Sequence, residues 1–169
     1  MKISAQEEYG VRCLLRLARA HGGAAPTIPE IAAAEQLSPA YAGKLLSLLK
    51  HAGFVEAQLG RTGGYRLTRP PEEIRLGEAL LALGEPLFEG DYCEKHAGPE
   101  ASGPCVHHDG CTLRGLWQAL EGWLRGVLDQ VSLRDLLTGE LPIVQKLREG
   151  VPTNNRLHGL GRPARLPIG

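Results

Sequence analysis

Three of the four cysteines lie close together in the middle of the chain, at Cys93, Cys105 and Cys111, with eleven and then five residues between them. The stretch between them adds His107 and His108, and several Gly and Pro residues interrupt it, so it predicts a loop. Thiolates and imidazoles are ligands for zinc and for iron–sulfur centres. A loop that gathers such groups is costly to order unless something binds it. The stretch therefore predicts a metal site or a redox-sensitive thiol site.

Spacing alone does not choose among the chemistries open to this loop. No Cys-x-x-Cys pair is present to favour zinc, yet a Cys₃His or Cys₃Glu set would still suit a tetrahedral zinc ion. Two of the cysteines could instead form a disulfide on oxidation, giving a metal-free thiol switch, or the loop could be inert. An enzyme is not expected, because nothing around Cys105 and His107 supplies an oxyanion site, a base with its orienting partner or a phosphate loop.

The length and composition of the chain indicate a cytoplasmic protein. Its 169 residues suit one domain of ordinary size, or a small domain with an appended arm. No apolar run approaches the ~20 residues that span a bilayer. The N-terminus lacks the apolar segment of a signal peptide. In a reducing compartment, clustered cysteines favour metal binding or redox sensing over structural disulfides.

Charge is unevenly distributed along a chain whose formal net charge is zero. Residues 1–72 contain nine Lys or Arg against six Glu, whereas residues 73–142 contain five against twelve acidic residues. Residues 143–169 are basic again. A basic N-terminal part followed by an acidic middle suits a nucleic-acid-binding face next to a half that makes no such contact, although charge alone does not decide this.

The N-terminal half has the pattern of a helix-turn-helix. Apolar periodicity predicts a first helix over residues 3–21. A second helix follows the capping-box spacing of Thr27 and Glu30, and ends near Gln36. Ser38, followed by a proline, then predicts the N-cap of a third helix that continues to about residue 51. Two short helices joined by a tight turn form the motif.

A β-hairpin is predicted directly after the third helix. Residues 54–59 and 65–67 have strand-like character, and a glycine-rich turn separates them. A helix-turn-helix followed by such a hairpin is a winged helix-turn-helix. The predicted fold class is therefore mainly α with a small β-hairpin wing, in which residues 1–83 form the DNA-binding domain.

The remainder of the chain is predicted to hold the loop and a long helix. A helix over residues 74–83 closes the first domain, and residues 84–111 form the cysteine-containing loop. A long amphipathic helix begins at residue 112, and with a short following helix it fills residues 112–141. Its apolar stripe is too long for the small first domain to cover, so we expect it to pack against a second copy in a homodimer. Residues 142–169 are rich in Gly, Pro and Arg and predict a disordered tail.

Polar residues at the start of the third helix are the expected readers of DNA. The second helix of a helix-turn-helix enters the major groove, so its exposed polar side chains meet base edges and phosphates. Arg61 at the wing tip would probe the minor groove or the phosphate backbone. The predicted DNA contacts are Ser38, Tyr41, Lys44 and Ser47 on the helix, Arg61 on the wing, and Lys2, Lys50 and Arg66 as phosphate contacts.

Several short motifs, in this order, resemble the IscR/NsrR-type winged-helix regulators. The motifs are Tyr9-Gly10-Val11-Arg12, Ser38-Pro39-Ala40-Tyr41, Gly63-Gly64-Tyr65-Arg66-Leu67, the three cysteines, and a helix with Trp117 in its second turn. The resemblance covers residues 1 to about 140. It implies a homodimeric bacterial transcription factor that binds a palindromic operator on double-stranded DNA. It also implies that a 2Fe–2S or 4Fe–4S cluster controls this binding in response to nitric oxide, redox state or iron–sulfur supply.

The resemblance further implies a ligand set, with departures from the usual pattern. Cys93, Cys105 and Cys111 match the three thiolate ligands, although the first gap is longer than usual. Some members take a fourth ligand from a histidine at the position of Arg114, which cannot ligate. Others take a carboxylate from the first helix of the partner subunit, where this chain has Glu8. His107, or its neighbour His108, is a weaker alternative.

The wing also departs from the family pattern. The arginine often found before the wing glycines is replaced by Leu59, so Arg61 would take over its role. The alternative to a cluster-controlled regulator is a winged-helix regulator or interaction module that uses structural zinc or a cysteine thiol switch.

Overall fold

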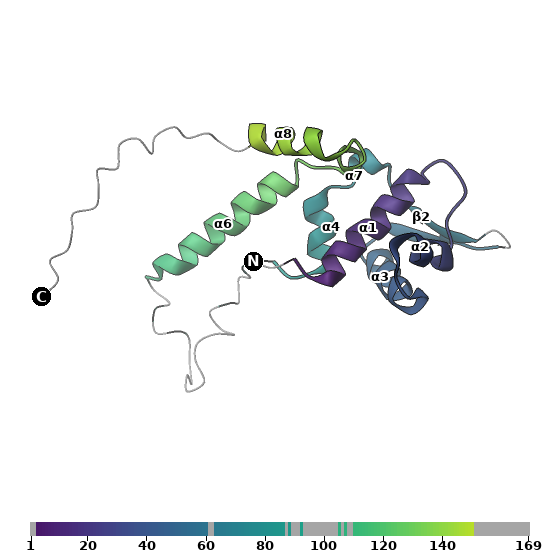
Figure 1. Ribbon diagram of the computed structural model, residues 1–169. Helices are drawn as coiled ribbons and strands as arrows, with labels where there is room; N and C mark the ends of the chain where they lie inside the picture. The colour runs from purple at the N-terminus through teal and green to yellow at the C-terminus, as the bar shows by residue number, and fades with distance from the viewer. Residues whose placement is uncertain are drawn as a thin grey trace, which may run out of the picture.

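The protein is built mainly from helices, with one two-stranded hairpin in the part of the chain that the structure describes (Figure 1). The computed structural model describes residues 3–60, 63–86, 88, 92, 105, 107 and 110–150, with backbone alone at 140–142 and 149–150. Along the chain the elements are α1 (Ala5–Arg19), α2 (Ile28–Glu35), α3 (Pro39–His51), β1 (Val55–Gln58), β2 (Gly64–Leu67), the 3-10 turn η1 (Pro71–Glu73), α4 (Leu76–Leu83), α6 (Thr112–Leu128), α7 (Leu133–Leu136) and α8 (Glu140–Gly150). The predicted fold class is confirmed.

Hydroxyl side chains define the starts of α2 and α3. Thr27 Oγ1 accepts a hydrogen bond from the backbone N–H of Glu30 at 3.4 Å, and the Glu30 carboxylate accepts one from the Thr27 N–H at 2.7 Å. Ser38 Oγ accepts from the N–H of Tyr41 at 3.2 Å. These bonds satisfy N–H groups that have no partner within the helix. Both predicted caps are confirmed.

Helix α3, the second helix of the helix-turn-helix, is held in place by the turn before it and by the core beneath it. Gln36 ends α2 in the left-handed conformation at φ +56°, which turns the chain sharply towards α3. One face of α3 is then buried against α1 and α2, leaving the opposite face for other contacts. The buried side chains that join the three helices are Leu14, Leu17, Ile31, Leu45, Leu46 and Leu49.

The hairpin is antiparallel and is attached to the helical body. Val55 pairs with Leu67 at its base and Gln58 with Gly64 near its tip. The side chains of the base pair are both buried, whereas Gln58 is exposed. The N–H of Tyr65 donates to the carbonyl of Pro26 at 2.9 Å, which ties β2 to the segment before α2. The predicted hairpin is therefore present and held in one orientation.

After α6 the chain returns to the N-terminal body, which the sequence did not predict. The N–H of Leu76 donates to the carbonyl of Val131 at 2.8 Å, and the N–H of Leu133 donates to the carbonyl of Ile74 at 3.0 Å. The side chains of Val131, Leu133 and Ile74 are all buried. The start of α4 and the start of α7 thus form a short antiparallel bridge, and α7 packs with α1 and η1.

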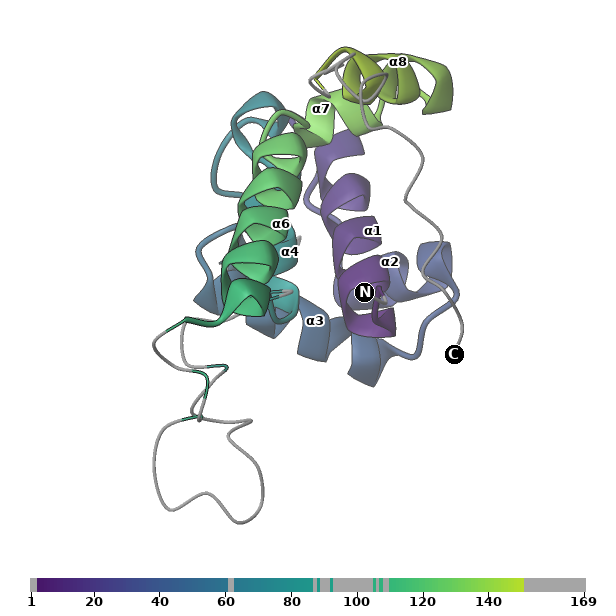
Figure 2. The same ribbon diagram turned by 90° about the vertical axis from the view of Figure 1, so that its left-hand side faces the viewer.

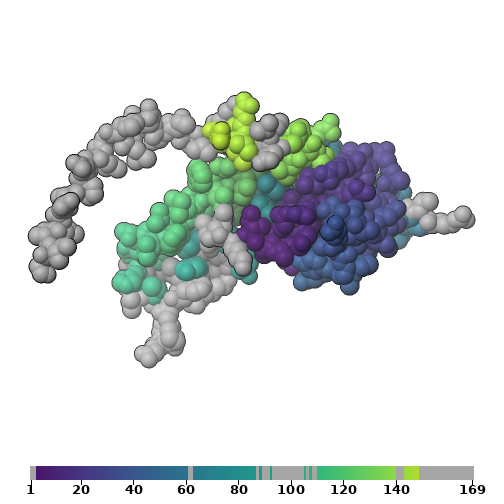
Figure 3. All heavy atoms as spheres, in the orientation of Figure 1, coloured from purple at the N-terminus to yellow at the C-terminus, as the bar shows by residue number. Residues whose placement is uncertain are grey.

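The long helix α6 lies along the outside of the body. It runs beside α4 (Figure 2), and none of its side chains is buried. In the space-filling view, α1 to α3 form one mass and α6 extends to one side of it (Figure 3). Its large exposed apolar side chains, each 38–57% accessible, are Leu113, Leu116, Trp117, Leu120 and Trp123. Within the described residues, no helix has the length and apolar character needed to cross a membrane.

The first part of the predicted disordered tail is helical in the structure. Helix α8 extends from Glu140 to Gly150, so residues 142–150 are helical and that part of the prediction is wrong. Pro142 occupies the first turn of this helix, where its missing N–H costs no intrahelical hydrogen bond. The rest of the expected tail, residues 151–169, lies outside the described residues.

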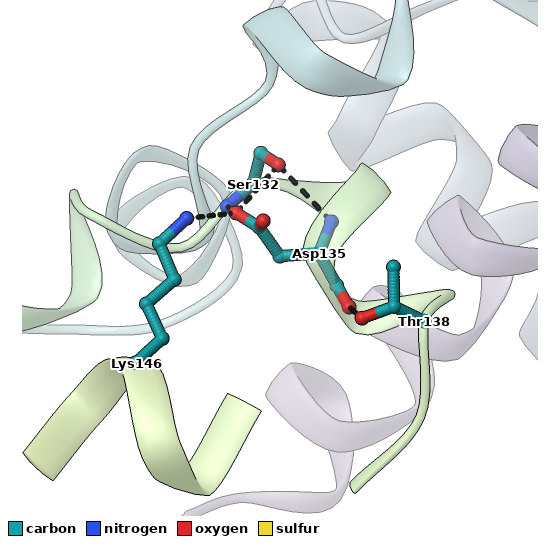
Figure 4. Close-up of polar contacts among 4 residues, drawn as sticks. All are labelled: Ser132, Asp135, Thr138 and Lys146. Atoms are coloured by element: carbon teal, nitrogen blue, oxygen red, sulfur yellow. Dashed lines mark hydrogen bonds and ion pairs between the residues drawn. The ribbon is translucent and has the colours of Figure 1, made fainter. Parts of the chain in front are cut away.

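An ion pair and a helix cap join α8 to α7 (Figure 4). Lys146 Nζ lies 2.6 Å from Asp135 Oδ2, which also accepts from the Ser132 N–H at 2.9 Å and the Ser132 hydroxyl at 2.8 Å. Burial raises the pKa of Asp135, but the bonds from Lys146 and Ser132 outweigh this effect and lower the pKa from 3.8 to about 2. The carboxylate is therefore bound in its charged form.

This contact predicts a specific loss of stability in acid. Because the folded-state pKa lies below the ordinary value, the stabilisation is complete above about pH 4 and is lost as the pH falls towards about 2. Asp135→Asn keeps an oxygen that can cap α7 but cannot titrate. We expect its melting temperature to be lower than that of the wild type at pH 7, with the difference shrinking between pH 4 and pH 2.

The measurement is thermal unfolding followed by circular dichroism across this pH range. Lys146→Gln is the matched control: it should lower the melting temperature at pH 7 by less, since the Ser132 bonds to Asp135 remain. A constant difference between the wild type and Asp135→Asn at every pH would contradict the assignment.

Candidate nucleic-acid interface and cysteine site

The outward face of α3 carries four of the eight predicted DNA contacts. Ser38, Lys44, Ser47 and Lys50 are all exposed on this helix. Ser38 also caps the helix, so its hydroxyl is already bonded to the backbone at the end that would meet DNA. This face presents hydroxyl and ammonium groups that can donate to phosphates or to base edges.

Tyr41 differs from the other predicted readers because its side chain is half-buried. Its ring lies edge-on to the ring of Tyr9, with the centroids 6.2 Å apart. The Arg12 guanidinium lies over the Tyr9 ring, 5.4 Å from its centroid. Tyr41 therefore packs α3 against α1, and its DNA contact stays a prediction.

The wing presents one predicted contact within the described residues. Arg66 Nε lies 2.7 Å from Glu56 Oε1 across the hairpin, and both side chains are about half exposed or more. A phosphate would have to compete with this carboxylate, so we expect Arg66 to contribute less than Lys44. Two other predicted contacts, Lys2 and Arg61, lie outside the described residues.

The exposed position of Lys44 gives a testable expectation for DNA binding. Lys44→Ala should weaken binding by a similar factor on specific and on unrelated duplexes, because an ammonium group on phosphate carries no sequence information. The slope of log K against log salt should fall by about 1. Fluorescence anisotropy titrations over a range of salt concentrations measure both quantities. A loss confined to one base pair of the operator would instead assign Lys44 to base reading.

Two of the three clustered cysteines lie in the described residues, next to the start of α6. Cys111 is the N-cap residue of this helix and Cys105 precedes it in the loop; both are free thiols with partly exposed side chains. His107 is exposed. Cys93 lies outside the described residues, which contain no group of three His, Cys, Asp or Glu side chains able to hold a metal. The set of three thiolate ligands stays a prediction.

The donors that are described fit a soft metal centre. Accessible thiols are suitable ligands for iron–sulfur clusters and for zinc. Cys111 also lies at a helix N-terminus, where unpaired backbone N–H groups stabilise negative charge on a bound group. The fourth cysteine contrasts with these. Cys13 is fully buried in α1, and burial raises the pKa of its thiol to about 11, so it is a protonated core residue.

The predicted carboxylate ligand is engaged within its own helix. Glu8 Oε1 lies 2.8 Å from Arg12, one turn along α1, and about half of each side chain is exposed. An exposed pair of this kind contributes little to stability. The Glu8 carboxylate is therefore accessible to a metal centre that approaches the start of α1, once its ion pair with Arg12 is broken.

Sequence reasoning missed two features that bear on these sites. One is the anchor of α7, although Ser132-Leu-Arg-Asp135 has capping-box spacing and could have been found from it. The other is Leu59, whose side chain is 94% exposed on the wing and which the sequence marked only as a departure from a pattern.

Comparisons with known proteins agree with the winged-helix architecture. The family model Rrf2, described as an iron-dependent transcriptional regulator, matches residues 3–139. The putative HTH-type transcriptional regulator Rv1287 of Mycobacterium tuberculosis is 32% identical over 148 residues, covering 84% of each chain. Regulators named NsrR and IscR are also among the relatives.

Two solved structures have the same fold over most of the chain. IscR of T. potens has a TM-score of 0.63 with 27% identity, covering 82% of this chain and 87% of its own. CymR of B. subtilis, described as its global cysteine regulator, has a TM-score of 0.62 with 30% identity, covering 82% and 97%. These relatives are DNA-binding transcriptional regulators and not enzymes. The predicted resemblance is confirmed, and the chain belongs to the Rrf2 family of transcriptional regulators.

Proposed function

We propose that this regulator binds its operator under the control of an iron–sulfur cluster held by Cys93, Cys105 and Cys111. The observation that carries the proposal is the position of Cys111, immediately before the seventeen-residue helix α6. A ligand at that position is joined directly to an element that could set the distance between two DNA-binding domains. In this proposal residues 1–83 read DNA, residues 84–111 bind the cluster and α6 forms the dimer contact.

The attachment of α6 to the body supports its proposed role in connecting the cluster to the DNA-binding domain. Its C-terminal end continues into the buried residues Val131 and Leu133, and Gly77 of α4 lies so close to Asp129 that a Cβ atom at Gly77 would overlap that carboxylate. The N-terminal half of α6 is almost entirely exposed. Ordering of the loop at Cys111 would then fix the free half of the helix relative to an end that is already anchored.

The apolar side of α6 supports a homodimer. Its N-terminal part exposes leucines and tryptophans. Further along the helix, a groove of about 180 Å³ between α4 and α6 is lined in part by Leu80, Leu124 and Leu128. A continuous apolar surface on a helix with no buried side chain is stabilised by packing against another protein surface. A second copy presents the same surface, so a symmetric dimer buries both at once. Two recognition helices would then read a palindromic operator.

The fourth ligand is proposed to be Glu8 supplied by the partner subunit, with His107 as the weaker alternative. Glu8 lies in the first turn of α1, where exchange of its Arg12 partner would release the carboxylate. A single oxygen ligand makes one iron more labile than an all-thiolate set. When bound, a cluster of the 2Fe–2S or 4Fe–4S type would supply a centre that reacts to nitric oxide, redox state or iron–sulfur supply.

The similarity to CymR favours one alternative. That protein is described as a cysteine regulator, and it matches this chain as well as IscR does. In the alternative, the same winged helix is controlled by a cysteine thiol switch or stabilised by zinc. The thiols of Cys105 and Cys111 are free and partly exposed, as a switch would require.

The deciding experiment is an absorbance spectrum of protein purified without air, with iron and acid-labile sulfide quantified per chain. We expect a broad visible band with both elements present, and their ratio distinguishes 2Fe–2S from 4Fe–4S. A colourless protein that contains zinc would overturn the cluster in favour of a structural site. A colourless, metal-free protein would leave the thiol switch, which reversible oxidation of Cys105 and Cys111 would then test.

A further inference from the structure

Leu59 is the most exposed large hydrophobic side chain among the described residues, at 94%. It follows β1 directly and precedes Gly60, whose φ of +120° turns the chain at the tip of the hairpin. The other strongly exposed leucines and tryptophans lie on α6 or at the end of α4. A single exposed leucine on a general surface is ordinary, but this one stands at the end of the wing.

Along β1 and the residue that follows it, alternate side chains become more exposed towards the tip of the hairpin. Val55 is 1% exposed, Ala57 is half-buried, and Leu59 is almost fully exposed. These alternate residues belong to the same face of the hairpin if the chain stays extended. Figure 1 shows the hairpin extending away from the helices, which agrees with the rise in exposed fraction from Val55 to Leu59. The apolar face of the wing therefore continues beyond the protein's own core.

The wing is held against the helical body along β2. The Tyr65 N–H bonds to the Pro26 carbonyl at 2.9 Å, and Glu56 pairs with Arg66 across the strands at 2.7 Å. Gly64 lies against the backbone carbonyls before α2, where a side chain would not fit. Leu59 is thus presented at the end of an anchored hairpin, which reduces the conformational entropy lost when it contacts a partner.

The partner at this position is the operator. Residues 52–54 join the end of α3 to the start of β1, and the four-residue strand carries the tip roughly 13 Å further. That reach is comparable to the ~12 Å width of the major groove. If α3 lies in the major groove, a tip displaced by this distance would meet the sugar–phosphate edge and the adjacent minor groove. Proteins that enter the minor groove often insert a leucine or another apolar side chain at a base step.

We propose that Leu59 enters the minor groove of the operator and wedges against a flexible base step, so that the wing reads DNA deformability. The proposal rests on DNA binding through α3 and is independent of the cluster. Pyrimidine–purine steps such as TA and CA unstack most easily, so they are the expected targets. Leu59 would then contribute sequence preference without a hydrogen bond to any base.

An apolar contact and a phosphate contact differ in their response to salt. Leu59→Ala removes no charge, so it should weaken operator binding by roughly tenfold and leave the slope of log K against log salt unchanged. Leu59→Met, which keeps an apolar side chain of similar volume, should restore most of the affinity. Lys44→Ala is the contrasting variant, since it should reduce the slope by about 1.

The test uses the full-length protein, purified without air, and a duplex that it selects from random sequence. One copy of the duplex carries 2-aminopurine at the TA or CA step expected to meet the wing. We expect the fluorescence of this base to rise on binding of the wild type and of Leu59→Met, and not of Leu59→Ala. Iron and sulfide content and melting temperature, measured on the same samples, report separately on the cluster and on folding.

Two results would overturn the proposal. One is that Leu59→Ala binds the duplex as tightly as the wild type and gives the same fluorescence rise. The other is that the wild type binds tightly with no rise at any pyrimidine–purine step of the selected site. In either case a normal iron and sulfide content would leave the proposed cluster-dependent function unaffected.

Discussion

Cys105→Ala should purify without iron or acid-labile sulfide and should lose operator binding that depends on them. The physical reason is that Cys105 belongs to a set of only three thiols in one loop, and a cluster left with two thiolates and weaker donors is unstable. The side chain is partly exposed and lies outside the buried core, so the winged helix itself should fold as before. The measurements are metal and sulfide analysis, the visible spectrum, and anisotropy titrations with specific and unrelated duplexes.

Cys13→Ala provides the matched control within the same chain. Its thiol is buried among the core side chains of α1, far from solvent, so its removal should cost about 1 kcal/mol of stability and leave the iron and sulfide content unchanged. Retention of both the cluster and cluster-dependent binding in Cys105→Ala would refute the proposed ligand set. Loss of both in Cys13→Ala would show instead that general destabilisation explains the result.

The local elements of this fold were predictable because their causes are local. Thr27 and Ser38 each have a hydroxyl that bonds a backbone N–H three residues later, which can be recognised from residue type and spacing alone. The hairpin followed from two short stretches of strand-like character around a glycine-rich turn. Composition was a poorer guide to the tail, because the Gly, Pro and Arg content that predicted disorder from residue 142 does not exclude a helix in which Pro142 lies in the first turn.

The bridge between Arg75 and Ser132 could not be predicted in the same way. It pairs two segments more than fifty residues apart through backbone groups, and backbone groups leave no mark in the sequence. For the candidate site, the clustering of cysteines was enough to predict metal binding or thiol chemistry. The position of Cys111 directly before the long helix was predicted as well. The sequence could not show that this helix is anchored at its other end by the buried residues Val131 and Leu133, on which the proposed coupling depends.

Gly64→Ala should be the most damaging single-methyl substitution in the winged helix. A Cβ atom at Gly64 would overlap the carbonyl oxygen of Ala25 and would lie 2.6 Å from that of Pro26. Both are backbone atoms, so neither can rotate away as a side chain would. Relief requires β2 to move off the segment before α2, which breaks the Tyr65–Pro26 hydrogen bond. We expect a loss of about 3 kcal/mol or more and a fall in melting temperature of roughly 10 °C.

Gly43→Ala is the comparison that isolates this steric cause. It adds the same methyl group inside α3, where the nearest atom, Ile28 Cδ1, is 3.7 Å away in ordinary contact, so helix propensity should stabilise the protein by roughly 0.5–1 kcal/mol. Thermal unfolding of both variants measures the difference. Because a displaced hairpin no longer presents the wing beside α3, Gly64→Ala should also weaken operator binding at temperatures where it stays folded. Equal stability of the two variants would mean that the hairpin is not seated on Ala25 and Pro26.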